Sequence, residues 1–209
     1  MSTTSAATLA ADELLPASVF PTGWKGQGAS SKNTDASFFG DTSGAEEQQI
    51  TTCIGIPTTN IVTNPAEAAD QEYDDPNSNV TVTDTVDVFP TTLDAATDAG
   101  AASNTKTPGC LVQLEGSTLS QGIAKSLGQG ATVGQVAAVD RSIPLYGDHD
   151  ADVVISFPFT YQGVSGTEYL ENVVIQEGRS ESNLQFSNTG SEVPIGIVDQ
   201  LAQAAAKRL

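Results

Sequence analysis

Apolar and polar positions alternate most regularly between residues 80 and 88. Valines occupy even positions and threonines or aspartates occupy odd positions, except that Asp84 interrupts the apolar series. A period of two places alternate side chains on opposite faces of a strand, so this stretch predicts a strand with one buried face. Thr91 and Asp94 have the spacing of a helix capping box, which predicts an alanine-rich helix from about Thr92 to Ser103.

A second group of alternating stretches lies nearer the C-terminus. The odd positions of residues 153–161 are apolar or aromatic, and the stretches 167–177 and 182–186 follow after short glycine-containing turns. Short connections between successive strands indicate an antiparallel meander. A further strand is expected at 133–143, which gives a sheet of about five strands. Pro158 lacks an N–H group, which favours a sheet edge or a bulge at that position.

Helical periodicity predicts the remaining elements. Short helices are expected near residues 5–15, around Cys53, after Cys110 and from Thr118 onward. A C-terminal helix is predicted by one apolar stripe, formed by Ile197, Val198, Leu201, Ala205 and Leu209. We expect this helix to pack on the apolar sheet face, on which we place Phe157, Phe159, Val173, Ile175 and Phe186.

The apolar residues are unevenly distributed along the chain. Residues 1–79 contain 12 Leu, Ile, Val and Phe residues, whereas residues 80–209 contain 35. The polar stretches 25–42 and 58–79 are therefore interpreted as irregular loop and surface excursion. We expect a single α+β domain over residues 1–209, with a loop-rich part at 1–79 that bears a cysteine helix and a core of sheet and helices at 80–209.

The two cysteines, Cys53 and Cys110, are either two buried thiols or one disulfide. Both lie beside apolar residues of predicted helices. Closing a loop of this length stabilises a fold by about 4 kcal/mol in the chain-entropy model, and it would act on the segment that is poorest in apolar residues. We favour the disulfide, and with it an oxidising, extracytoplasmic compartment.

The net charge of −18 argues against nucleic acid and anionic membranes as partners, because binding to phosphate needs clustered Lys and Arg. It is also typical of acidic surfaces that serve only solubility or salt adaptation. No run of 18 apolar residues occurs, and the N-terminus lacks a basic and hydrophobic signal region. Contact with a membrane is expected only through a lipid anchor whose cysteine is absent from this sequence.

The clearest candidate for site chemistry is the stretch 148–152, where Asp148, Asp150 and Asp152 alternate around His149. The glycine and glutamate that a calcium loop needs at its sixth and twelfth positions are missing, so we expect a solvated turn and no metal. His149 is the only histidine, so a Ser-His-Asp type of hydrolase would have to use it. No nucleophile elbow, Walker loop or paired-cysteine zinc motif accompanies it, and we expect no cofactor and no catalytic residues.

The chain resembles the sensor-domain-like lipoproteins of actinobacteria, which are related to the extracellular sensor domains of mycobacterial serine/threonine kinases. The resemblance rests on the order of these features: Leu14–Pro16, Pro21–Trp24, the helix around Cys53, Val82–Phe89, the alanine helix, Cys110–Leu111, the Gly147–Asp148 turn and the terminal helix ending in Arg208–Leu209. It implies an antiparallel sheet flanked by helices, a disulfide, and a cleft that receives a ligand. The kinase domains carry two disulfides, and this chain can form one.

Our first hypothesis is therefore a non-enzymatic sensor or binding domain of the cell envelope. A small ligand or an envelope protein would bind a sheet face or cleft near Tyr161 and Tyr169. Two alternatives come from other classes of function, namely a hydrolase that uses His149 and a structural module of a salt-adapted surface.

Overall fold

The computed structural model describes residues 5–31, 44–57, 67–114 and 116–209. The helices in these ranges are α1 (Ala6–Glu13), the 3-10 turn η1 (Ala17–Val19), α2 (Gly44–Ile54), α3 (Thr92–Ala102), α4 (Thr107–Leu114), α5 (Gly116–Leu127) and α6 (Ile195–Ala206). The strands are β1 (Lys25–Ser31), β2 (Glu67–Asp75), β3 (Val80–Val88), β4 (Thr132–Val133), β5 (Ala137–Asp140), β6 (His149–Tyr161), β7 (Val164–Glu177) and β8 (Ser180–Thr189).

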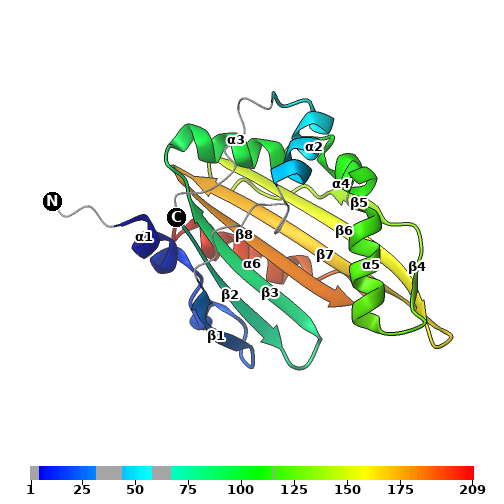
Figure 1. The fold of residues 1–209 in the computed structure, drawn as a ribbon. Helices are drawn as coiled ribbons and strands as arrows, with labels where there is room; N and C mark the ends of the chain where they lie inside the picture. Colours follow the sequence, from blue (N-terminus) through cyan, green and yellow to red (C-terminus); the bar gives the residue numbers. More distant parts are fainter. Residues whose placement is uncertain (1–4, 32–43, 58–66, 115) are drawn as a thin grey trace.

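All strands join one antiparallel sheet of eight strands in the order β1-β2-β3-β8-β7-β6-β4, with β5 also pairing with β6 (Figure 1). The α+β class, the meander of β6, β7 and β8, and the C-terminal helix on the sheet are confirmed. The expectation of about five strands was too low. Strands β1 and β2 lie in stretches that we interpreted as loop. They join the sheet because β2 pairs with β3 and β1 pairs with β2, and not because of an apolar pattern of their own.

The register between strands decides which side chains share a face. Phe157 lies opposite Glu168, and Val173 lies opposite Asp152. Odd positions of β6 therefore share a face with even positions of β7. We expected Phe157 and Phe159 to lie on the same face of the sheet as Val173, Ile175 and Phe186. That expectation is wrong, because the two phenylalanines lie on the opposite face. We call the face with Phe157 the α3 face and the face with Val173 the α6 face.

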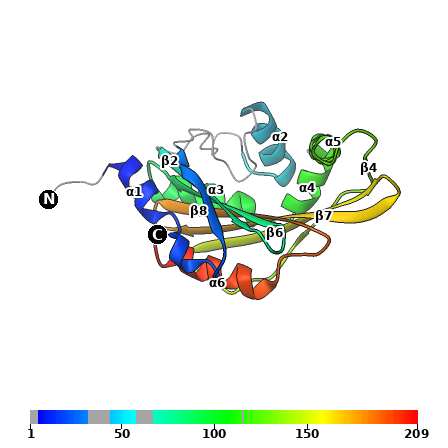
Figure 2. The same cartoon turned by 90° about the horizontal axis from the view of Figure 1, so that it is seen from below.

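The α6 face carries the larger core. Figure 2 shows α6 on one side of the sheet and α2, α4 and α5 on the other. Leu201 of α6 is fully buried there, as its apolar stripe predicted. The other buried residues of this core come from the N-terminal segment, four strands, the loop before α6 and α6 itself: Leu15, Phe20, Tyr73, Val80, Val82, Val173, Ile175, Leu184, Phe186, Val193, Val198, Ala202 and Ala205.

The α3 face carries a second core over β6 and β7. Its buried residues are Ile50, Ala99, Ala102, Leu111, Val136, Ala151, Val153, Ile155, Phe157 and Val174. Strands β6 and β7 are thus buried on both faces, which explains their uninterrupted apolar runs Val153–Ile155 and Val173–Ile175. Strand β3 keeps strict alternation over most of its length because its core residues face the α6 side.

Pro158 divides the strand expected at 133–143 into β4 and β5. Its carbonyl accepts a hydrogen bond from Gly134 N at 2.6 Å, but it has no N–H to donate in return. The pairing with β6 shifts by one residue at this point: Val133 lies opposite Phe159, whereas Ala137 lies opposite Ser156. The predicted bulge is therefore present.

Asp84, the polar interruption in β3, anchors the N-terminal segment on the α6 face. Its fully buried carboxylate accepts hydrogen bonds from Leu15 N at 2.6 Å and from Ser182 Oγ at 3.1 Å. Tyr73 donates its hydroxyl to the Leu15 carbonyl at 2.5 Å. Burial raises the pKa of Asp84 to about 6, although both hydrogen bonds and the charge of Arg208 lower it.

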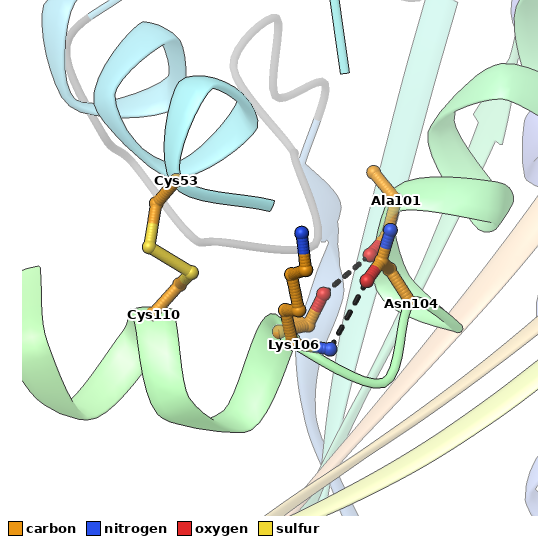
Figure 3. The surroundings of a disulfide bond; sticks show 6 residues. Cys53, Ala101, Asn104, Lys106 and Cys110 are labelled. Carbon is orange, nitrogen blue, oxygen red and sulfur yellow. Dashed lines mark hydrogen bonds between the residues drawn. A yellow bond between two sulfur atoms is a disulfide. The ribbon is translucent and has the colours of Figure 1, made fainter. Parts of the chain in front are cut away.

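Cys53 of α2 and Cys110 of α4 form a disulfide, with 2.03 Å between the two sulfur atoms (Figure 3). This confirms the predicted bridge. Three residues before Cys110, Thr107 Oγ1 donates to the Ala101 carbonyl at 2.6 Å, which ties the start of α4 to the end of α3. The disulfide thereby links α2 to the helices of the α3 face.

Candidate ligand-binding face

A polar area occupies the part of the α3 face formed by β3, β8 and the neighbouring half of β7. Helix α3 packs on β6, β7 and β8, α4 packs on β5, and α5 packs on β4 and β6. Figure 1 shows α4 and α5 on the β6 side of the sheet and α3 across the strand ends, whereas β2 and β3 lie on the other side of the sheet. We call this area the polar face; it consists of Thr81, Thr83, Thr85, Asn172, Asn183, Gln185 and Ser187.

The residues of the polar face stand in rows across adjacent strands. Thr83, Gln185 and Asn172 form one row, and Thr85 and Asn183 lie in the next. The threonines are half-buried and Gln185 is exposed. The opposite parity of the same strands supplies valine, leucine and phenylalanine to the α6-face core, so that strand alternation directs the polar set outward.

Hydrogen bonds link residues of the polar face to one another and to β2. Gln185 Nε2 donates to Asn172 Oδ1 at 3.1 Å, and Thr81 Oγ1 donates to Asp74 Oδ1 at 3.0 Å. The Asn183 Oδ1 atom is buried and accepts no hydrogen bond within the described part of the chain. Amide and hydroxyl groups of this kind recognise ligands with hydroxyl, amide or ammonium groups.

At its α3 end the polar face is bordered by a row of buried acceptors. Asp87 of β3, Glu181 of β8 and Gln176 of β7 lie directly opposite one another, and each is at most 2% exposed. Burial raises the pKa of Asp87 and of Glu181 well above the usual carboxyl range. The neighbouring carboxylate of Asp98, on α3, raises both further.

The two tyrosines predicted to bind a ligand do not share a site. Tyr161 pairs with Val164 at the tip of the β6–β7 hairpin and faces the α3 side. Tyr169 pairs with Ser156 and faces the α6 side. A ligand-binding role for either residue remains a prediction, but one ligand on one face cannot contact both.

The acidic stretch at the start of β6 is divided among different partners. Asp148 Oδ2 accepts from Gly178 N at 3.3 Å, and Asp150 Oδ1 accepts from Gly147 N at 3.1 Å. Asp152 Oδ2 pairs with Arg141 Nε at 2.8 Å. His149 is exposed, opposite Gln176. These contacts fix the turn before β6, and no group of three or more His, Cys, Asp or Glu side chains in the described ranges is suited to hold a metal ion.

Arg141 forms the main buried ion-pair network, on the α6 face. Its guanidinium contacts Asp152 and Glu171, whose side chains are 0% and 2% exposed, and reaches Glu192 at 3.7 Å. Burial raises the pKa of Asp152, whereas the hydrogen bond and charge of Arg141 oppose that shift. The network connects the segment after β5 with β6, β7 and the loop before α6, and it therefore holds these parts of the fold together.

Sequence reasoning missed the polar face, although part of its signal was visible. The threonines of β3 were recognised as the outward set of an alternating strand. Asn183, Gln185 and Ser187 alternate with Leu184 and Phe186 in the same way. What the sequence did not show is that β8 lies beside β3, which brings the two outward sets together.

No family model matches the chain, and no curated protein matches it. Among solved structures, the chain is similar to the extracellular domain of PknH from Mycobacterium tuberculosis, with a TM-score of 0.50, 12% sequence identity, and coverage of 94% of this chain and 92% of that chain. At this identity the similarity concerns the fold alone. It agrees with the fold implied by the resemblance to extracellular sensor domains, whereas no sequence match supports the lipoprotein family.

None of the helices in the described ranges is both long enough and apolar enough to cross a bilayer.

Proposed function

We propose that this chain is a non-enzymatic, extracytoplasmic sensor-like or binding domain whose polar face receives an envelope ligand or partner rich in hydroxyl and amide groups. The observation that carries the proposal is the polar face itself. A sheet that is buried on both faces at β6 and β7 presents hydroxyl and carboxamide side chains on β3 and β8, next to the helices of the same side.

Three further observations support the compartment and the kind of ligand. The Cys53–Cys110 disulfide is typical of proteins in an oxidising compartment. The net charge of −18 disfavours polyanions such as nucleic acid and anionic lipid surfaces. The similarity of the fold to an extracellular domain is consistent with both.

The test is a titration followed by amide chemical shifts, with soluble peptidoglycan fragments and neutral oligosaccharides as probes. We expect saturable shifts centred on β3 and β8, and at least a fivefold weaker affinity after Gln185→Ala. Gln203→Ala makes the same chemical change at an exposed position of α6 and should leave the affinity unchanged. Shifts confined to other elements, or equal effects of the two substitutions, would contradict the assignment.

The same samples distinguish the hydrolase alternative. Hydrolysis of ester or phosphate substrates that disappears in His149→Ala would overturn the non-enzymatic proposal. We expect no such activity, because no nucleophile elbow or other catalytic motif accompanies His149 in the sequence.

A further inference from the structure

The N-terminal segment, residues 5–20, lies on the α6 face without joining the sheet. Its helix α1 packs on β2 and β3. The backbone-to-backbone hydrogen bonds that residues 5–24 make in the described part of the chain are local, such as the bond from Val19 N to the Pro16 carbonyl. No described strand pairs with the segment. Its attachment to the fold therefore depends on side chains of other elements and on apolar packing.

Side chains of the sheet and of α6 bind the main chain of this segment. Asp84 of β3 accepts from Leu15 N at 2.6 Å, and Tyr73 of β2 donates to the Leu15 carbonyl at 2.5 Å. Gln200 of α6 donates to the Val19 carbonyl at 2.7 Å. In peptide recognition, bonds to main-chain groups give affinity and pockets for side chains give specificity. The segment is thus held in the way that a bound peptide is held.

The C-terminal end of α1 is bound in the same manner. Arg208, which follows α6, donates from Nε to the Glu13 carbonyl at 3.0 Å and from Nη2 to the Asp12 carbonyl. A helix leaves the carbonyls of its last turn without partners inside the helix. Arg208 therefore completes the end of α1 from outside the segment.

Four apolar side chains of the segment are buried by this docking, namely those of Ala10, Leu14, Leu15 and Phe20, and each is at most 7% exposed. Ala10 and Leu14 pack with two valines of β3, whereas Leu15 and Phe20 enter the α6-face core. The Phe20 ring stacks on Tyr73 with 3.8 Å between the ring centroids. We call the surface that receives the segment the docking surface; it consists of Tyr73, Asp84, Val86, Val88, Gln200 and Arg208.

The segment ends at a turn that can serve as a hinge. Trp24 N donates to the Pro21 carbonyl at 3.3 Å, and the exposed Gly23 between them has a φ of 108°. Strand β1 begins directly afterwards, at Lys25. Hinges are a few loop residues that absorb large changes in backbone angles. A change within Pro21–Trp24 would move residues 5–20 as a unit and leave the pairing of the sheet intact.

We propose that the docking surface is a peptide-binding site, which residues 5–20 of the same molecule occupy here and which accepts the same segment from a second copy of the chain. This inference goes beyond the proposed function, because it concerns the opposite face of the sheet and a different partner. A second copy carries every group that the docking surface binds, including the backbone of Leu15 and the side chains of Leu14 and Phe20. Exchange of an identical element between protomers is a low-cost route to a dimer.

The molecule's own segment competes with any segment that comes from another molecule. It is tethered by a short turn, which gives it an effective concentration of about millimolar or more. A change that weakens only the tethered segment should therefore strengthen the binding of a free one, whereas the same change in the free segment should weaken it. A segment that is a permanent part of the core would show neither effect.

The first experiment measures the fluorescence anisotropy of a labelled synthetic peptide, residues 5–22, added to the full chain. We expect saturable binding that is at least tenfold tighter to the full chain with Leu15→Ala than to the wild type. A peptide that itself carries Leu15→Ala should bind at least tenfold more weakly. Leu93→Ala is the matched control, since it makes the same change at a leucine of α3 that is 75% exposed, and it should leave the affinity unchanged.

Circular dichroism confirms that each variant is folded before titration. Should Leu15→Ala not fold, the milder Phe20→Leu, which removes the stacking on Tyr73, takes its place with the same expected direction. The absence of saturable peptide binding, equal affinities for the wild type and the weakened variant, or an equal effect of Leu93→Ala would each overturn the inference.

The second experiment identifies the molecule that donates the segment. A full chain that carries photoreactive p-benzoylphenylalanine in place of Phe20 should cross-link to β2 or α6, because the Phe20 ring lies on Tyr73. Mass spectrometry of the cross-linked species then separates links within one chain from links between two chains. We expect links between chains to increase as the protein concentration is raised from about 10 µM to about 1 mM. If only links within one chain form over this range, a second copy is not the partner and the inference fails.

Discussion

Replacing Asp84 by Asn should stabilise the protein at neutral pH and leave it unchanged in acid. The Asp84 carboxyl is fully buried, and its pKa is about 6 in the folded protein against 3.8 as the ordinary value. The asparagine can keep both contacts, since its oxygen accepts from Leu15 N and its amide nitrogen can donate to Ser182 Oγ.

The magnitude follows from linkage. Between pH 3.8 and pH 6 the folded state binds more protons at Asp84 than the unfolded state, so the free energy of unfolding falls as pH rises through this window. Above pH 6 the loss is complete. A difference of 6 − 3.8 pKa units, at 1.36 kcal/mol for each unit, corresponds to about 3 kcal/mol as an upper value.

The measurement is urea unfolding of the wild type and of Asp84→Asn at pH 4, 5, 6 and 7. Other buried acids also titrate, but they are common to both proteins, so the difference between the two isolates Asp84. This difference should be near zero at pH 4 and should grow to about 2–3 kcal/mol at pH 7 in favour of the variant. Asp12→Asn, at an exposed position of α1, controls for the change in net charge. A difference that does not vary with pH would refute the reasoning.

Three further outcomes test the cores and the cross-links. Leu201→Ala should lower the free energy of unfolding by about 2–5 kcal/mol, because the side chain is fully buried between α6 and the sheet; a loss below about 0.5 kcal/mol in urea unfolding would mean that α6 is not docked. Replacing Cys53 and Cys110 by Ser should lower the free energy of unfolding by about 4 kcal/mol, because the disulfide closes a loop between residues that are 57 positions apart. Amide hydrogen exchange should then rise first in α2, and a uniform loss of protection would contradict this. Arg141→Met should lower the free energy of unfolding by about 3–5 kcal/mol at pH 7, because it leaves the buried carboxylates of Asp152 and Glu171 without their cation. The loss should be smaller at pH 4. An equal loss at both pH values would argue against an ionic role for Arg141.

Features set by neighbouring residues could be predicted from the sequence. The alternation in β3 is local, and so is the capping box of α3, in which Thr91 Oγ1 accepts from Asp94 N at 3.2 Å. The stripe of α6 is likewise a property of one helix and predicted correctly that Leu201 is buried. Periodicity within one element determines which of its own side chains point the same way.

The face shared by two strands depends on the turn between them, and there the sequence reasoning failed. We expected the strand at 153–161 to be followed by a turn that continues until the next strand begins at Thr167. The turn instead occupies Gln162 and Gly163, which both have positive φ (50° and 79°), so that Tyr161 pairs with Val164. A two-residue turn of this kind sets an odd-to-even register, and every side chain of β7 then faces the side opposite to our prediction.

Elements and sites that depend on distant pairing could not be predicted. Strand β2 carries one buried aromatic, Tyr73, among acidic residues, and it is held by β3 on one edge and β1 on the other. The polar face requires β3 and β8 to be neighbours, although about 100 residues separate Asp84 from the Leu184 that lies opposite it. Such adjacency comes from the packing of the whole sheet rather than from any local pattern.

The break at Pro158 has a consequence for self-association. An open sheet edge presents unpaired N–H and C=O groups, which can add a strand from another molecule and begin aggregation. On this side of the sheet the edge consists of a two-residue β4 and a four-residue β5 that are out of step by one residue. Neither piece offers a continuous template, so the proline that interrupts the ladder also protects the molecule against growth from this edge.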